Sequence, residues 1–283
     1  MHVVSVILHL FNTLLVGLLA LRVMENKQLA TGRWFPFALS MLIYGLHPLL
    51  VETVVWISDQ FDLVAMLFML LGLVLNATIK RTIVRALCVT ISFFLAAFAK
   101  ESAAAFPLLL VIFDWFSLNE TQGASKLDQF KLLLKRHWHV YVCVFAAGII
   151  YIVLRRWAIS GFIPLLGNNP LPASARLQEM AFLYVRYWRM LFWPTAGMAP
   201  AHPVPVGDFI RISTLSIFND VLTIDLICGG VVLALRRHYV GGLILLITTA
   251  LVPVPVLYLV GPILDEGIYN ERYPTTALAV GCA

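Results

Sequence analysis

Long apolar runs alternate with short polar connections along almost the whole chain. A helix needs about 20 mostly apolar residues to cross a bilayer, and about eight runs approach this length. They cover residues 3–21, 34–55, 63–79, 83–99, 103–116, 140–154, 221–235 and 240–260. The second run is predicted to break at His47-Pro48, because proline removes a backbone donor from a helix. The pattern therefore predicts an all-α, polytopic transmembrane bundle of about eight spans.

Charged residues in the connections divide by type between the two sets of helix ends. One set carries Glu52, Asp59 and Asp62 in one connection and Lys100-Glu101 in the next. The other set carries lysine and arginine, namely Arg22, Lys27, Arg33, Lys80, Arg81 and Arg85. Short loops rich in lysine and arginine stay in the cytoplasm. We therefore expect the carboxylate-bearing ends to face the periplasm or a lumen.

The overall composition supports the same class of protein. Hydrophobic residues make up 61% of the 283 residues and charged residues only 12%, whereas soluble domains carry about 25% charged residues. The net charge of +5 is assigned to anchors on the inner face and not to nucleic-acid binding, since no basic stripe is interleaved with aromatic residues. We expect a multi-pass integral membrane protein. A bacterial inner membrane is favoured over the endoplasmic reticulum membrane, because no retention signal is present.

Two further segments are not simple spans. Residues 117–139 combine lysine and arginine with apolar residues at helical spacing, which predicts an amphipathic helix on the inner leaflet; a solvated loop is the alternative. Residues 180–193 either span the bilayer or lie flat in the outer interface. The flat helix is favoured because it leaves Arg236-Arg237-His238 on the cytoplasmic side. A long outer loop is predicted between these segments, at 155–178.

The outer helix ends collect most of the groups capable of chemistry. They are His47, Glu52, Asp59, Asp62, Lys100, Glu101, Asp265, Glu266, Glu271 and Arg272. Ionisable groups near hydrocarbon are costly, so they tend to pair or to serve a ligand. The carboxylates could deprotonate a hydroxyl or hold a divalent cation, and Lys100 and Arg272 could clamp a phosphate. In the alternative interpretation, Lys100 and Glu101 only neutralise neighbouring charges and cap helices.

Four short motifs, in order along the chain, resemble a known family. They are His9-Leu10-Phe11-Asn12; His47-Pro48-x-x-x-Glu52 with Trp56-Ile57-Ser58 and Asp62-Leu63; Lys100-Glu101-Ser102 with Pro107-Leu108 and Asp114-Trp115; and Glu271-Arg272-Tyr273. Together they resemble the GT-C-type polytopic glycosyltransferases of the tetratricopeptide-linked O-mannosyltransferase group and their bacterial relatives. Asp59-Gln60 departs from this pattern, since the family has Gly-Arg before its conserved aspartate.

The resemblance implies a GT-C-like fold and a function. The reaction implied is transfer of a sugar from a polyprenyl- or dolichyl-phosphate carrier to a protein or glycan acceptor, on the extracytoplasmic face. It implies catalytic roles for Glu52 and Asp62, which would orient the acceptor or a divalent cation. It implies binding of the lipid-linked substrate by His47, Lys100, Glu101 and Arg272.

The resemblance also sets an expectation about the extent of the domain. We expect residues 1–283 to be one incomplete transmembrane domain that lacks the family's first helix and first outer loop, which bears the principal acid. Its other end is expected to stop inside a span. Two other function classes stay open: a membrane transporter or lipid flippase, and a non-catalytic membrane scaffold.

Overall fold

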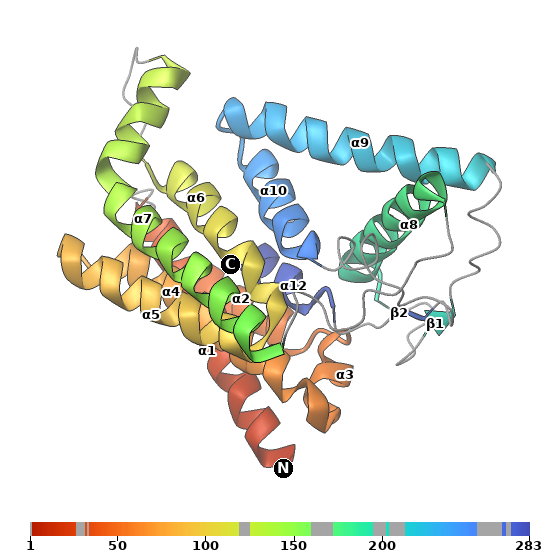
Figure 1. Cartoon of the computed structure of the whole chain (residues 1–283), viewed down its shortest axis with the longest axis horizontal. Helices are drawn as coiled ribbons and strands as arrows, with labels where there is room; N and C mark the ends of the chain where they lie inside the picture. Colours follow the sequence, from red (N-terminus) through yellow and green to blue (C-terminus); the bar gives the residue numbers. More distant parts are fainter. Residues whose placement is uncertain are drawn as a thin grey trace.

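The computed structural model describes residues 2–26, 32, 34–118, 125–159, 172–194, 202–203, 213–253, 268–269 and 273–283. Its helices are α1 (His2–Asn26), α2 (Trp34–Gly45), α3 (Leu50–Val55), η1 (Ile57–Asp59), α4 (Gln60–Thr78), α5 (Thr82–Ala99), η2 (Glu101–Ala105), α6 (Phe106–Ser117), α7 (Lys126–Ile159), α8 (Ala173–Phe192), α9 (Thr214–Leu235), α10 (Tyr239–Leu251) and α12 (Thr275–Cys282). Two short strands, β1 (His202–Pro203) and β2 (Ile268–Tyr269), pair antiparallel. The described fold is otherwise entirely helical (Figure 1).

Five helical segments are long and apolar enough to cross a membrane. They are His2–Glu25, Ile57–Thr78, Thr82–Ala99, Lys126–Ala158 and Thr214–Leu235, and the apolar helices Trp34–Gly45 and Tyr239–Leu251 are shorter. Many of their side chains are exposed on the outside of the bundle, for example Ile83 at 76% and Phe145 at 71%. Lipid solvates such groups, whereas water would not. The chain is a multi-helix membrane protein, and the number of about eight spans stays a prediction.

The core forms where α1, α4, α5, α6 and α7 pack together, in the left half of Figure 1. Leu63, Met66, Leu70, Phe106 and Leu109 are almost completely buried there. Gly72 on α4 allows this close approach, because a Cβ atom at that position would lie 2.7 Å from Cζ of Phe106. The interior of the bundle is therefore closely packed apolar material, and polar groups concentrate at its two ends.

Breaks between helices follow local sequence signals. The chain leaves α2 at Gly45 and resumes as α3 at Leu50, so the predicted break at His47-Pro48 is confirmed. The fifth predicted run is shorter than expected as an α-helix, because it opens with the 3-10 turn η2 before α6. Helix α9 begins earlier than predicted, where Ser213 and Ser216 form a reciprocal capping box.

The predicted boundary between residues 117–139 and 140–154 is wrong. One continuous helix, α7, covers 34 residues from Lys126. This stretch contains no proline, and its buried positions from Gln129 to Ala147 recur at helical spacing, so nothing interrupts the backbone hydrogen bonds. The segment is helical from Lys126 onward, but Gln129, Leu133 and His137 form its buried side while Leu127, Phe130 and Leu134 are exposed. Its predicted position on the inner leaflet stays a prediction.

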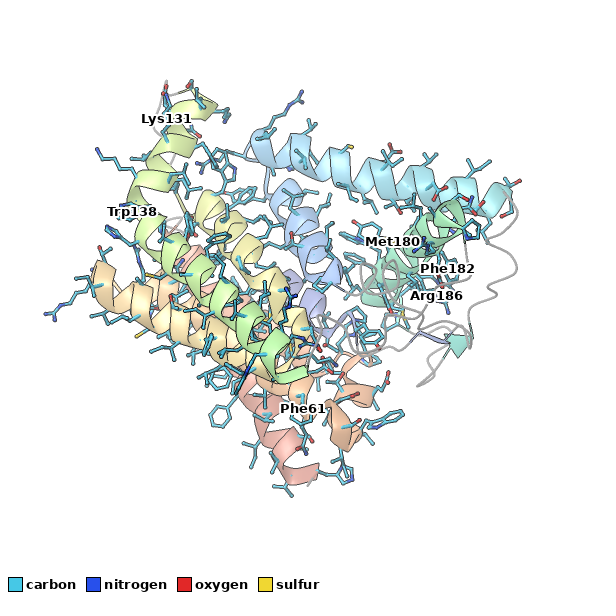
Figure 2. All side chains as sticks on the ribbon, viewed as in Figure 1. Phe61, Lys131, Trp138, Met180, Phe182 and Arg186 are labelled. Carbon is cyan, nitrogen blue, oxygen red and sulfur yellow. The ribbon has the colours of Figure 1, made fainter. Side chains whose placement is uncertain are left out.

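Helix α8 differs from the long apolar helices. It is 20 residues long, yet it is not among the five segments apolar enough to span. It packs against α9 in the right half of Figure 1, and Figure 2 shows Met180, Phe182 and Arg186 along it. The helix begins directly after Pro172, so residues 173–178 of the predicted outer loop are helical. Residues 160–171 of that loop lie outside the described residues.

The contacts of Arg155 and Arg237 place the end of α7 and the end of α9 at opposite ends of the bundle. Arg155, at the end of α7, pairs with Glu101 at the carboxylate-bearing end of the bundle. Arg237, just after α9, donates to the carbonyl oxygen of Leu118 at the opposite end of α6, at 2.8 Å. The end of α9 therefore lies opposite the carboxylate-bearing end, whereas the end of α8 contacts His47 at the carboxylate-bearing end through the carbonyl oxygen of Leu191. The flat orientation of α8 in the outer interface stays a prediction.

Candidate functional site

The candidate site is built on the broken connection between α2 and α4. Trp56 has extended backbone (φ −81°, ψ 116°) and separates α3 from η1. The two short helices place Glu52, Asp59 and Asp62 in one compact connection, with exposed fractions of 8%, 2% and 8%. Burial of a carboxylate is costly unless it is compensated. The connection therefore gathers three buried carboxyl groups at this end of the bundle.

Lys100 meets this connection from α5. Its extended backbone ends α5, and its ammonium group forms an ion pair and hydrogen bond with Oδ2 of Asp62. The same Nζ lies 5.9 Å from the centre of the Tyr273 ring. Three segments far apart in sequence therefore meet at Lys100: the start of α4, the end of α5 and Tyr273, two residues before α12. Asp62 and Lys100, which the sequence places in two successive connections at the same set of helix ends, form an ion pair.

Glu101 makes a different ion pair. Its Oε1 accepts a hydrogen bond from Nη2 of Arg155 at 2.5 Å, and Nη1 of Arg155 also donates to the Tyr151 hydroxyl at 2.7 Å. Partial burial opposes ionisation of Glu101, but the hydrogen bond and charge of Arg155, with the charge of Lys100, outweigh it and lower the pKa of the carboxyl. Glu101 therefore connects η2 to the end of α7, away from Asp62.

His47 connects the α2–α3 turn to α8. Its Nδ1 accepts a hydrogen bond from the backbone N–H of Leu49 at 3.2 Å, and its Nε2 lies 3.1 Å from the carbonyl oxygen of Leu191. These partners require a proton on Nε2 and none on Nδ1, which is the neutral form. Burial lowers the pKa of His47, and the Leu191 carbonyl only partly opposes this. Both ring nitrogens are used within the chain, so His47 positions α8 beside the site.

Glu179 on α8 is a buried acid that the sequence interpretation did not single out. Its exposed fraction is 0%, and within the described part of the chain neither of its carboxylate oxygens has a hydrogen-bond partner. Burial raises its pKa to about 7. The available signal was its spacing: Ala175, Glu179, Leu183 and Tyr187 follow one another at four-residue intervals on the buried face. An acid on the apolar face of a helix is a candidate for proton binding.

Several predicted site residues lie outside the described residues, namely Asp265, Glu266, Glu271 and Arg272. Tyr273, which follows the last of these in sequence, is described and lies beside Lys100. Among the described residues there is no group of three or more histidine, cysteine, aspartate or glutamate side chains placed to hold a metal ion. The predicted divalent cation therefore has no ligand set within the described part of the chain.

An apolar groove lies beside this end of the bundle. It has a volume of about 560 Å³ and is lined by α8, α9 and α10, including Met180, Tyr184, Ile224 and Val252. Tyr184 and Thr248, which both line it, share a hydrogen bond between their hydroxyl groups, at 2.7 Å. Helix α10, whose Thr248 lines the groove, also contacts η2, the turn that follows Lys100. The arrangement can accommodate a ligand with an anionic head and an apolar tail.

Comparisons of the chain with protein families, with curated proteins and with solved structures find no match.

Proposed function

We propose that the chain is the membrane domain of a glycosyltransferase that takes a sugar from a polyprenyl- or dolichyl-phosphate carrier and transfers it on the extracytoplasmic face. The proposal rests on the order of the four sequence motifs, and its main structural support is the ion pair between Asp62 and Lys100. That pair joins two of the motifs at one end of the bundle. A GT-C-like fold and a protein or glycan acceptor are parts of the same proposal.

Lys100 has the properties of a phosphate-binding group. An ammonium group has three N–H donors, and Asp62 accepts from one of them. The side chain of Lys100 is 24% exposed, so the remaining donors can reach a ligand. During transfer, the bond from sugar C1 to the carrier phosphate breaks, a bond from C1 to the acceptor oxygen forms, and the phosphate leaves with an additional negative charge. Lys100, with Arg272, would stabilise that charge.

The carboxylates of the connection would act on the acceptor side. Glu52 and Asp62 would orient the acceptor hydroxyl, whose proton passes to a carboxylate as the new bond forms. His47 would hold α8 and the apolar groove in place for the carrier's tail. Glu101, engaged by Arg155, would act by positioning η2 next to Lys100.

The test is turnover of a polyprenyl-phosphate sugar by the protein in lipid nanodiscs. Lys100→Ala is expected to reduce turnover about 100-fold, and Lys100→Arg to recover part of it. Lys131→Ala is the control, because Lys131 is exposed at the opposite end of the molecule, as Figure 2 shows for Lys131 and Phe61. Melting temperatures of all variants separate loss of activity from loss of folding. Turnover by folded Lys100→Ala at the wild-type rate would refute the proposed role.

A proton-coupled transporter or lipid flippase is the second candidate, and Glu179 favours it. Transporters use buried acids with pKa values near neutrality to bind and release protons. Substrate-dependent proton uptake into proteoliposomes, abolished by Glu179→Gln, would support transport over sugar transfer.

A further inference from the structure

A second polar site lies at the other end of the bundle, where α4 meets α5 and α6 meets α7. It is a pocket of about 400 Å³ whose lining includes Asn76, Lys80, Arg85, Asp114, Arg136 and His137. None of these residues belongs to the candidate site around Lys100. The pocket opens at the helix ends that carry Lys80 and Arg81, which the positive-inside rule assigns to the cytoplasm.

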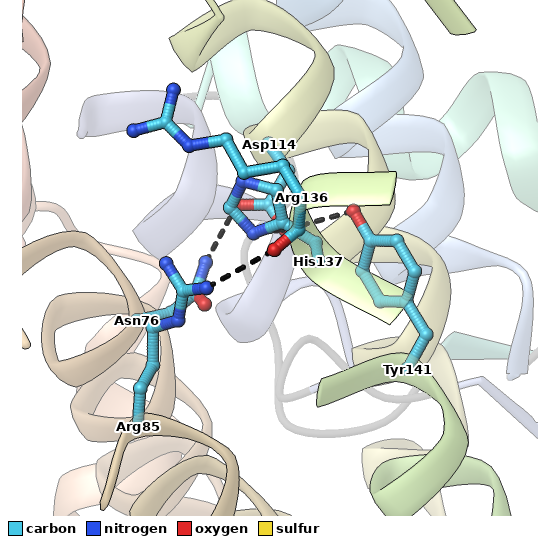
Figure 3. A network of polar contacts seen from close by, with 6 residues as sticks. All are labelled: Asn76, Arg85, Asp114, Arg136, His137 and Tyr141. Atoms are coloured by element: carbon cyan, nitrogen blue, oxygen red, sulfur yellow. Dashed lines mark hydrogen bonds and ion pairs between the residues drawn. The ribbon is translucent and has the colours of Figure 1, made fainter. Parts of the chain in front are cut away.

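Asp114 on α6 forms the rigid floor of this pocket. It is 2% exposed. Its Oδ1 accepts from Nδ2 of Asn76 at 2.6 Å, its Oδ2 accepts from the Tyr141 hydroxyl at 2.8 Å, and Nδ1 of His137 lies 3.1 Å from the same Oδ2 (Figure 3). Both oxygens of the carboxylate are therefore occupied by groups from α4 and α7. The network fixes three helices around the pocket and leaves the carboxylate little capacity to neutralise other charges.

Arg85 on α5 is the buried cation of the pocket. Its exposed fraction is 8%. Its Nη2 donates to the backbone carbonyl oxygen of Arg136 at 3.4 Å, and its Nε has no hydrogen-bond partner within the described chain. None of the described carboxylates forms an ion pair with it. A buried guanidinium group is costly without a charged partner. An anion from outside the described residues would therefore stabilise the buried charge of Arg85.

The charges around Arg85 specify the kind of anion. Arg136 and Lys80 add two further cations to the lining, against one carboxylate among the described lining residues, that of Asp114, which is already engaged. Arginine offers parallel N–H donors that match two oxygens of a phosphate. Lysine can donate a further hydrogen bond to another phosphate oxygen. Basic pockets between helices at the cytoplasmic surface are suited to phosphate head groups.

We propose that this pocket binds a phosphate group, with Arg85 as its central ligand. The phosphate can belong to an anionic phospholipid of the inner leaflet or to a soluble phosphate compound, since both present the same oxygens. The inference is independent of the proposed transferase activity, because it rests on no residue of the candidate site. The network around Asp114 gives the site its shape, and the three cations give it its selectivity for anions.

The experiment compares two neighbouring arginines. Arg85→Gln removes the buried cation, whereas Arg81→Gln removes an exposed cation that does not line the pocket. The protein is reconstituted in phosphatidylcholine nanodiscs with and without phosphatidylglycerol, and binding of inorganic phosphate is measured by calorimetry in the lipid-neutral sample. Lys80→Gln serves as a second variant, because Lys80 is exposed and its replacement does not disturb the core.

If the ligand is a lipid, the melting temperature of the wild-type protein is expected to be higher in nanodiscs that contain phosphatidylglycerol than in nanodiscs of phosphatidylcholine alone. If the ligand is a soluble phosphate compound, inorganic phosphate is expected to bind the wild-type protein in nanodiscs of phosphatidylcholine alone. In either case, affinity should fall about tenfold or more in Arg85→Gln, fall in Lys80→Gln, and stay at the wild-type value in Arg81→Gln. Equal losses in Arg81→Gln and in the two pocket variants would overturn the proposal, as would the absence of both effects in the wild-type protein.

Discussion

Asp62 at the start of α4 forms an ion pair with Lys100 at the end of α5, 38 residues further along the chain. The two helices run antiparallel as a hairpin, so their carboxylate-bearing ends meet. Asp62 also lies in the first turn of α4, where the helix dipole favours a negative charge. The pair therefore stabilises the helix start and holds Lys100 in the position that the proposed chemistry needs.

Asp62→Asn is expected to lower the free energy of unfolding by about 1–3 kcal/mol, because it leaves a partly buried ammonium group without its counter-ion. Thermal unfolding in detergent measures the effect. Asp128→Asn is the matched control: Asp128 pairs with Lys131 at 3.9 Å, and the two side chains are 61% and 67% exposed. Exposed pairs contribute little, so a control effect as large as that of Asp62→Asn would contradict the assignment.

Glu101→Gln is expected to show a stability defect that depends on pH. The pKa of Glu101 is lowered from its ordinary value of 4.5 in the folded protein, so its contribution is complete above pH 4.5 and is lost as the pH falls through the lowered pKa. The difference in melting temperature between wild type and Glu101→Gln should therefore shrink on acidification below pH 4.5. A difference that stays constant down to the lowest pH would show that Arg155 does not act through the charge of Glu101.

Glu179→Gln is expected to have the opposite pH dependence. Because burial raises the pKa of Glu179 to about 7, the folded state is penalised progressively as the pH rises from 4.5, and the penalty levels off above pH 7. The variant should gain stability over wild type across this range, by on the order of 3 kcal/mol at its upper end. Melting curves from pH 5 to pH 8 measure the gain. A pH-independent difference would mean that Glu179 does not titrate in this range.

His47→Ala is expected to loosen α8. The substitution removes the contact with the Leu191 carbonyl oxygen at 3.1 Å, and the net loss is about 1 kcal/mol. Hydrogen exchange at the end of α8 should increase. The pKa of His47 is lowered from 6.5, so wild type should lose stability as the pH falls below 6.5, whereas the variant should lose less. His2→Ala, near the start of α1, is the control; loosening of α8 by this control would argue against a local contact.

The helices and their breaks could be predicted because they follow from local patterns. Apolar runs of membrane length predicted five segments that the structure confirms as long and apolar enough to span. Pro48 predicted the break after α2. The division of 117–154 into two elements failed because a change in composition was taken as a helix end, although the backbone of α7 continues without interruption. A change from polar to apolar residues alters the surroundings that a helix contacts, and it does not by itself end the helix.

Alternation of charge type along the chain was enough to place Asp62 and Lys100 at one set of helix ends and Lys80 and Arg85 at the other. Packing between helices decided the partners within each end: Glu101 with Arg155, 54 residues away, and His47 with Leu191, 144 residues away. It also decided which charges lose contact with water, as Glu179 and Arg85 do. A helix forms through contacts between near neighbours in sequence, whereas ion pairing and burial depend on distances between helices, and these exist only once the bundle is assembled.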